Sequence, residues 1–319
     1  MTVLVLTRRF DPTADLVIRE LYRRDVPVFR CDPGDFPERV ELCAHISAAG
    51  TVTGTLHQGT RELCLSAISS VYHRRPSTHR VSPRLDDNDR RWSEREATAG
   101  FQGILTALNR PWVNHPDVNR AAAHKPHQLA AAACAGLTIP ESLITNTTKA
   151  AHTFSLAKAK TIYKSMTGGP GTPAGERSAQ ALYTTIVAPE EITPNVRHTA
   201  HLFQVWAEKA YEVRLTVVGD QLFAVRIDAE SQAARIDWRS DYDHLAYTPV
   251  EIPHDVHQAV IRLMVDLRLI YGALDFVVTP EGQWVFLELN PNGQWGWIEL
   301  TAGLPIAAAI ADRLQKARK

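Results

Sequence analysis

The sequence predicts an α/β protein made of α+β lobes, because apolar runs of strand length alternate with amphipathic stretches of helix length. The chain has 319 residues, of which 45% are hydrophobic and 22% are charged, so it can bury a large core. Clusters of glycine and proline divide it into sections. We therefore expect three lobes, at residues 1–116, 117–203 and 204–319.

The opening section is predicted to be a small α/β domain that begins with a strand–helix–strand unit. These three elements are expected at Val3–Leu6, Thr13–Tyr22 and Pro27–Phe29. Another strand is expected at Ser69–Tyr72, before a helix-rich stretch at Asp86–Leu108.

The second section is predicted to begin with a helix over Ala121–Ala135, which Gly136 and Pro140 terminate. A strand follows at Thr161–Ser165, where Lys164 offers a fixed positive charge for phosphate. Backbone N–H groups of the next segment, MTGGPGTPAGE, can wrap phosphate oxygens, although such clusters are more often flexible linkers. The segment is not a Walker A loop, because GxxxxGK[ST] is absent.

The third section is predicted to be rich in strands and to close with a helix at Pro305–Ala317. A hairpin is expected around the turn Gly219-Asp220. Glu212 and Arg214 share one face of its first arm, whereas a two-residue turn directs Arg226 to the other face. Arg214 is therefore the stronger site candidate, with exposed strand charges as the alternative for both arginines.

Oxygen ligands converge near the end of the chain, where two apolar runs flank the turn PEG. Glu288 and Asn290 share a strand face, and an even-numbered loop centred between Glu281 and Gly282 places Asp275 opposite Glu288. A one-residue bulge would make that pairing diagonal. Such hard oxygen ligands suit Mg²⁺ held partly by substrate phosphates, and a solvated polar strand end is the less favoured interpretation.

Charge and cysteine usage exclude several classes of protein. Basic and acidic residues number 35 each, which argues against a general nucleic-acid surface or a basic membrane-facing patch. No apolar stretch approaches the length of a membrane span. The apolar run at the start of the sequence is too short for a signal peptide. Because the four cysteines form no CxxC pair, we expect reduced, partly buried thiols in a cytoplasmic protein.

Several of these motifs together resemble the ATP-grasp ligases. The shared order is KPHQL, a strand lysine with a glycine-rich loop, QVWAEK, YEVR, and finally an aspartate followed by ELNPNGQW. VYHRRPSTHR and the extension NGQWGWIE are more similar to the graspetide, or microviridin-type, maturases, which crosslink side chains of ribosomally made peptides. This resemblance covers most of the chain. It implies an ATP-grasp fold with an N-terminal pre-ATP-grasp domain and with central and C-terminal lobes that clasp ATP.

The resemblance also implies ATP and Mg²⁺ as ligands, with roles for particular residues. The implied contacts to phosphate are Lys125, Lys164, Gly168 and Gly169. The implied contacts to adenine and ribose are Gln204, Trp206, Ala207 and Glu212, within or beside a hinge at 204–209. The implied metal ligands are Asp275, Glu288 and Asn290. The implied catalytic or peptide-recognition residues are Arg214, Arg226, Asp237 and Arg239.

The reaction implied by the resemblance is a ligation in which a substrate Asp or Glu carboxylate becomes an acyl phosphate. A Thr or Ser hydroxyl, or a Lys amine, of the same peptide then closes the crosslink. The implied partner is a precursor peptide with a leader and an acidic core that contains Thr or Ser, and a homodimer is also implied. A strand or helix groove of the enzyme would bind the leader.

Two alternatives to a peptide maturase stay open. One is an ATP-grasp ligase that joins an amino acid or short peptide to a small-molecule or protein carboxylate or amine, in a small, closed acceptor pocket. The other is a noncatalytic nucleotide- or peptide-binding module, which the presence of all three oxygen ligands argues against. His73-Arg74-Arg75 either faces an acidic core or is a set of solvated charges. Trp295 and Trp297 are expected to pack the turn against the core or, less often, to wall the peptide site.

Overall fold

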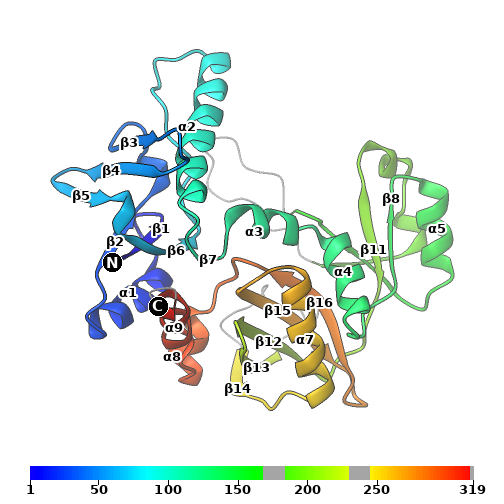
Figure 1. Cartoon of the computed structure of the whole chain (residues 1–319). Helices are drawn as coiled ribbons and strands as arrows, with labels where there is room; N and C mark the ends of the chain where they lie inside the picture. Colours follow the sequence, from blue (N-terminus) through cyan, green and yellow to red (C-terminus); the bar gives the residue numbers. More distant parts are fainter. Residues whose placement is uncertain (168–183, 230–244, 317–319) are drawn as a thin grey trace.

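The structure is a computed structural model that describes residues 1–167, 184–229 and 245–316. Figure 1 shows an N-terminal part in blue and cyan, a green lobe that projects from the other side, and a yellow and orange sheet between and below them. The predicted mixture of helices and strands is confirmed. No helix within the described ranges has the length and apolar character needed to cross a membrane.

The N-terminal sheet is parallel and has the strand order β2-β1-β6-β7. Its elements and neighbours are β1 (Thr2–Thr7), α1 (Pro12–Arg23), β2 (Val28–Cys31), η1 (Pro33–Asp35), η2 (Leu65–Ala67), β6 (Ile68–Arg74), α2 (Asp87–Ala107) and β7 (Trp112–Val113). A separate antiparallel sheet comprises β3 (Val40–Ile46), β4 (Val52–Gln58) and β5 (Arg61–Cys64). The predicted strand–helix–strand opening is confirmed. Asp11 starts α1 by accepting hydrogen bonds from the backbone N–H groups of Thr13 and Ala14.

The connection to the green lobe contains two helices where the sequence predicted one. These are α3 (Pro116–Ala122) and α4 (Lys125–Cys134), so the expectation of a single helix over Ala121–Ala135 was wrong. Pro126 lies at the start of α4, where its missing N–H is harmless, whereas inside a continuous helix it would remove a backbone hydrogen bond.

The green lobe is an antiparallel sheet with the strand order β10-β9-β11-β8. Its elements are β8 (Ser142–Thr145), α5 (Thr148–Leu156), β9 (Thr161–Lys164), β10 (Thr185–Val187), η3 (Pro189–Glu191), η4 (Pro194–His198) and β11 (His201–Val205). The lobe boundary predicted between residues 203 and 204 falls inside β11.

The third sheet is antiparallel and has the strand order β14-β13-β12-β15-β16. Its strands are β12 (Tyr211–Val218), β13 (Gln221–Ala229), β14 (Leu245–Pro249), β15 (Tyr271–Val278) and β16 (Trp284–Asn290), and the helices packed around it include α7 (His254–Asp266), α8 (Gly296–Ala302) and α9 (Ile306–Lys316). One apolar core joins this sheet to α4 and α7. A second core joins it to α1, β1, α8 and α9, so the last helices of the chain pack beside the first (Figure 1).

Strand register confirms two predictions about the third sheet and corrects the reason for one of them. Arg214 lies opposite Val225 and Arg226 opposite Val213, so the two arginines occupy opposite faces. Asp275 lies opposite Glu288, but the connecting loop has an odd number of residues, and the register shifts beside Asp275. The extra residue, Leu287, is a bulge that restores the predicted pair.

Two further expectations were tested by burial. Trp295 is completely buried in the core that includes α1 and α9, which confirms its predicted packing role. The cysteines are all free thiols, as predicted, but Cys43, Cys64 and Cys134 are exposed and only Cys31 is buried.

Candidate active site

A cleft between the green lobe and the third sheet gathers most of the predicted nucleotide and metal residues. It contains about 510 Å³ of empty space, part of it open to solvent. The predicted residues that line it are Lys164, Gln204, Trp206, Ala207, Glu212, Asp275 and Glu288. Residues of the second and third sections therefore line one site.

A buried ion pair joins two neighbouring strands of the third sheet. Arg214 on β12 and Asp275 on β15 are direct ladder partners, and Arg214 Nε lies 3.0 Å from Asp275 Oδ1. Their side chains are only 8% and 7% exposed, so each charge depends on the other for compensation. Arg214 thus lies beside the first predicted metal ligand.

A second ion pair joins the start of α4 to the end of β16. Lys125 Nζ lies 2.8 Å from Glu288 Oε2, so a predicted phosphate ligand contacts a predicted metal ligand. Gln128, one turn further along α4, fixes this contact in place. Its side chain donates to the carbonyl oxygen of Leu289 at 2.7 Å and accepts from the Leu289 N–H at 3.0 Å. No pattern in the sequence indicated this role of Gln128.

Asn290 completes the predicted set of oxygen ligands at the end of β16. It is exposed, and it lies two residues after Glu288, on the same strand face. Its Oδ1 accepts a hydrogen bond from the Asn292 N–H at 3.1 Å, which starts the turn after the strand. Carboxylate and amide oxygens on two facing strands, with lysines nearby, are a donor set that fits Mg²⁺ bound together with phosphate.

Part of the cleft lining suits a flat heteroaromatic ring. Apolar side chains of Ile162, Val277 and Leu287 line it. Gln204 is 1% exposed and donates to Ser142 Oγ at 2.9 Å, while its Oε1 meets no hydrogen-bond donor among the described residues. A buried acceptor without a partner is costly, so this oxygen suits a ligand donor such as the exocyclic amine of adenine.

Basic side chains flank the indole of Trp206 beside this part of the cleft. The Nζ atoms of Lys160 and Lys209 lie 4.4 Å and 5.5 Å from the ring centroid. Lys209 also forms an ion pair with Glu212, the residue predicted to lie near ribose. Glu212 is 7% exposed and shares its strand face with Arg214, as predicted. Lys209 therefore contacts both Trp206 and Glu212 in this part of the cleft.

Other predicted residues do not join the cleft or lie outside the described ranges. The guanidinium of Arg226 forms two-pronged hydrogen bonds to the Asp228 carboxylate and lies over the ring of Tyr211. The hydrogen bonds that Arg226 donates to Asp228 raise the pKa of Arg226. The residues outside the described ranges are Gly168, Gly169, Asp237 and Arg239.

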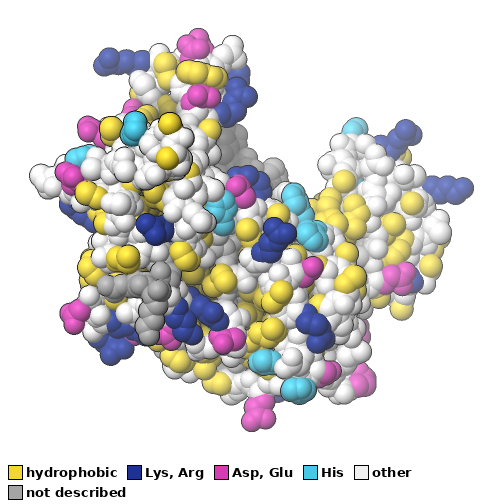
Figure 2. Space-filling model, viewed as in Figure 1, with side chains coloured by type: hydrophobic (Ala, Val, Ile, Leu, Met, Phe, Trp, Pro, Cys, Tyr) yellow, Lys and Arg dark blue, Asp and Glu magenta, His cyan; other side chains and the backbone are white. Residues whose placement is uncertain are grey.

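A second, wider groove begins where the metal-ligand strand ends. It contains about 3030 Å³ of empty space, including the part open to solvent. Its walls come mainly from α2, α3 and residues 76–79, and Asn290, Pro291 and Asn292 also line it. Figure 2 shows this face of the molecule hollowed between the part that carries α2 and the green lobe of Figure 1. Asn290 therefore lies between the cleft and a groove of peptide size.

Comparisons with known proteins agree with this architecture. Residues 2–120 match the family model described as the MvdD pre-ATP grasp domain. No protein of curated function matches the chain by sequence.

Solved structures match over nearly the whole chain. A Chryseobacterium gregarium ATP-grasp ligase associated with ribosomally synthesised and post-translationally modified peptides, solved with ADP and a leader and core peptide, is 28% identical with a TM-score of 0.90, over 99% of this chain and 96% of that one. Macrocyclase MdnC of Microcystis aeruginosa MRC, bound with precursor peptide MdnA, is 28% identical with a TM-score of 0.86, over 99% and 100% of the two chains. Macrocyclase MdnB of the same organism is 29% identical with a TM-score of 0.81, over 98% of each chain. The whole chain thus has the ATP-grasp fold of these ligases, and residues 2–120 form a pre-ATP-grasp domain.

Proposed function

We propose that this protein is an ATP-dependent macrocyclase of a ribosomally made precursor peptide. It joins Asp or Glu side chains to Thr or Ser hydroxyls as esters, or to Lys amines as amides. The observation that carries the proposal is that Glu288 lines the nucleotide cleft, while Asn290, two residues later on the same strand, lines the wide groove. A peptide carboxylate in the groove would thereby reach the phosphate end of the cleft.

The proposed binding roles follow the layout of the cleft. Lys125 and Lys164 bind the phosphates of ATP, and Gly168 and Gly169 cover them. The side chains of Asp275, Glu288 and Asn290 hold Mg²⁺, which when bound neutralises phosphate charge. The proposed contacts to adenine and ribose are Gln204, Trp206, Ala207 and Glu212.

The proposed chemistry has two steps. An oxygen of the substrate carboxylate attacks the γ-phosphorus of ATP, the bond to the bridging oxygen breaks, and ADP leaves. A hydroxyl or amine of the same peptide then attacks the carbonyl carbon, the bond to the phosphate oxygen breaks, and phosphate leaves. Arg214, held by Asp275, places a cation where the negative charge develops. The groove must also exclude water, which would hydrolyse the acyl phosphate.

We also propose how the peptide is recognised. The Chryseobacterium ligase was solved with a leader and a core peptide, and we propose the same two-part partner here. Arg226, Asp237 and Arg239 are proposed to contact the acidic core. We propose a cytoplasmic protein, because all four cysteines are free thiols. A homodimer is a further prediction, which light scattering at micromolar concentration tests.

The size of the groove favours a peptide substrate over a small acceptor molecule. A ligase for an amino acid or another small molecule is expected to enclose its acceptor in a compact pocket. Here Asn290 borders a groove of about 3030 Å³ of empty space that runs along α2 and α3. This space fits an extended peptide segment better than a single amino acid.

Mass spectrometry of a candidate precursor tests the proposal. The substrate to test is a small peptide that is encoded beside this protein and is rich in Thr or Ser together with Asp or Glu; it is incubated with the protein, ATP and Mg²⁺. Each crosslink removes one water, so the proposal predicts ATP-dependent water losses that are absent with Glu288→Gln. An unchanged peptide, together with ATP hydrolysis triggered by a free amine or small carboxylate, would contradict it in favour of a small-molecule ligase.

A further inference from the structure

We propose that Arg74 is a positioning residue for the metal ligands, through the turn that follows Asn290. The inference rests on the proposed function, because it takes Asn290 as a ligand of Mg²⁺. The side chain of Arg74 is only 2% exposed, so it is not a solvated surface charge. It ends β6 of the N-terminal sheet, far from Asn290 in sequence.

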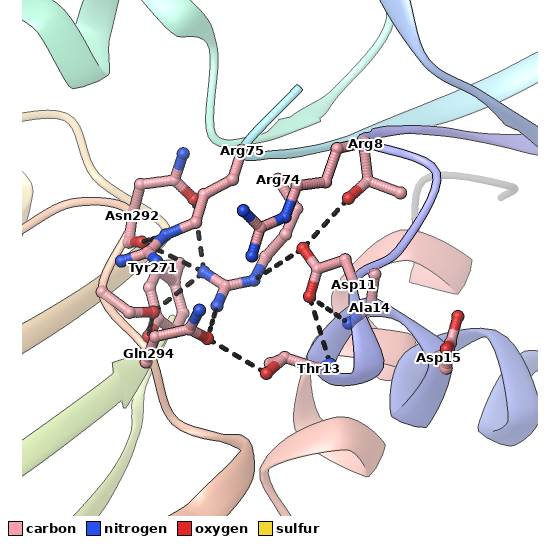
Figure 3. A network of polar contacts seen from close by, with 12 residues as sticks. Arg8, Asp11, Thr13, Ala14, Asp15, Arg74, Arg75, Tyr271, Asn292 and Gln294 are labelled. Atoms are coloured by element: carbon pink, nitrogen blue, oxygen red, sulfur yellow. Dashed lines mark hydrogen bonds and ion pairs between the residues drawn. The ribbon is translucent and has the colours of Figure 1, made fainter. Parts of the chain in front are cut away.

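The guanidinium of Arg74 is coordinated by the turn at residues 292–294. It donates to the carbonyl oxygens of Asn292 at 3.1 Å and Gly293 at 2.9 Å, and to the side-chain oxygen of Gln294. The carboxylate of Asp11 is 3.9 Å from Arg74 Nε (Figure 3). A buried cation is costly unless it is well paired, so this turn is constrained to keep its oxygens directed at Arg74.

Further side chains from the same side of the molecule hold the turn. Thr13 at the start of α1 donates to the side-chain oxygen of Gln294 at 3.0 Å, and Asp11 caps the same helix. Arg75 Nε donates to the Asn292 carbonyl oxygen at 3.0 Å (Figure 3). The N-terminal domain therefore contacts the turn with several independent hydrogen bonds.

The third sheet and the connecting segment hold the chain on either side of Asn290. Tyr271 donates its hydroxyl hydrogen to the Gly293 carbonyl oxygen at 2.8 Å. Asn114 donates to the Pro291 carbonyl oxygen at 3.1 Å, and Gln128 makes paired hydrogen bonds with the backbone of Leu289. Asn290 itself is exposed between these fixed neighbours, so its side-chain oxygen has a defined position without being buried.

This arrangement lets the N-terminal domain influence the metal site through the backbone of the turn. Arg74 has no contact with the ligand oxygens, and its effect passes through the backbone from residue 292 to residue 290. Groups that support metal ligands in this way typically alter metal affinity by about 10–100-fold when mutated. We therefore expect Arg74 to control how strongly Mg²⁺ tightens the binding of nucleotide, with little effect on the adenine end of the cleft.

The test compares the affinity for ADP with and without Mg²⁺, measured by calorimetry on the full chain. Arg74→Lys keeps the charge and loses the planar, several-pronged donor. It is expected to bind ADP alone as the wild type does, while the tightening caused by Mg²⁺ falls at least about 10-fold. The matched control is Arg24→Lys, because Arg24 also joins the N-terminal domain to the C-terminal helices, through Asp312 and Gln315. This control should leave the tightening unchanged.

Several outcomes would overturn the inference. A folded Arg74→Lys protein with the wild-type response to Mg²⁺ would do so, as would equal losses of ADP affinity with and without Mg²⁺. If Arg74→Lys does not fold, Gln294→Met decides by the same ratio, because it keeps the arginine and removes one acceptor. A wild-type protein that binds ADP with Mg²⁺ but crosslinks no peptide would contradict the proposed function alone.

Discussion

Lys125 and Glu288 form an ion pair of 2.8 Å that joins the first turn of α4 to the end of β16. The two residues belong to different halves of the chain, and Gln128 holds their elements together through the backbone of Leu289. A cation suited to phosphate and an anion suited to metal are thereby held side by side. Phosphate and metal are expected to bind cooperatively, because each one compensates a member of this pair.

Glu288→Gln tests the metal assignment. The substitution keeps the size of the side chain and removes its charge, so ATP turnover in the presence of the peptide should fall by about 100-fold or more. Because the pair with Lys125 is partly exposed, the loss of unfolding free energy should be about 1 kcal/mol or less. Turnover measured against Mg²⁺ concentration checks this. Glu281→Gln, at an exposed acid of the loop before β16, is the control, and equal rates in the two variants would refute the assignment.

The Arg214–Asp275 pair is expected to matter for stability as well as for activity. Arg214→Met removes this ion pair from the buried carboxylate of Asp275 and should cost about 3–5 kcal/mol of unfolding free energy. Combining it with Asp275→Leu should recover most of that stability and leave the protein inactive. Urea unfolding and ATP turnover measure both effects. Full activity in the double variant would show that neither charge takes part in the reaction.

Gly293 allows the turn after β16 to pack against the sheet. An added Cβ would lie 2.5 Å from the Cβ of Ala273, so Gly293→Ala should destabilise the protein by about 1–3 kcal/mol. Gly100→Ala in α2 is the matched control. An added Cβ there meets no atom of the described chain within 4 Å, and stability should rise by about 0.5–1 kcal/mol. Thermal unfolding distinguishes the two, and a neutral Gly293→Ala would contradict the packing.

His73 should make stability depend on pH. Burial, with a smaller effect of His115, lowers the pKa of His73 from 6.5 to about 4. The unfolded chain therefore takes up a proton at His73 near pH 6.5, whereas the folded protein takes it up only near pH 4. The stabilisation is complete above pH 6.5, and about 3 kcal/mol is lost as the pH falls toward 4.

Urea unfolding of the wild type and of His73→Phe between these pH values measures this effect. The variant lacks the titrating group and should lose less stability in acid. His127→Gln, at an exposed histidine, serves as the control and should follow the wild type. Parallel pH profiles for the wild type and His73→Phe would contradict the assignment.

The sequence contained enough information to predict elements whose signals are local. Alternating residues placed Arg214 and Arg226 on opposite faces, whereas the predicted pair of Asp275 with Glu288 forms because a bulge offsets the odd-numbered loop. The bulge at Leu287 was not predicted, because a bulge depends on how the partner strand packs and has no distinct residue type. The break between α3 and α4 carried a local signal in Pro126 that was given too little weight.

Long-range polar contacts could not be predicted from the sequence. The sequence left Arg74 either facing an acidic core or solvated, yet its partners at residues 292–294 bury it. Gln128 in an alanine-rich helix gave no sign that it binds the backbone of Leu289. Such contacts depend on tertiary structure, since neither partner has a sequence pattern that specifies the other.

The most direct test of the central claim follows oxygen from the peptide into phosphate. A precursor peptide whose Asp and Glu side chains carry heavy oxygen is incubated with the protein, ATP and Mg²⁺. The masses of the released phosphate and of the peptide are then measured by mass spectrometry. Activation as an acyl phosphate predicts one heavy oxygen in phosphate for each crosslink, with ADP as the other product. Crosslinked peptide with unlabelled phosphate, or with heavy oxygen in AMP, would contradict the proposed mechanism.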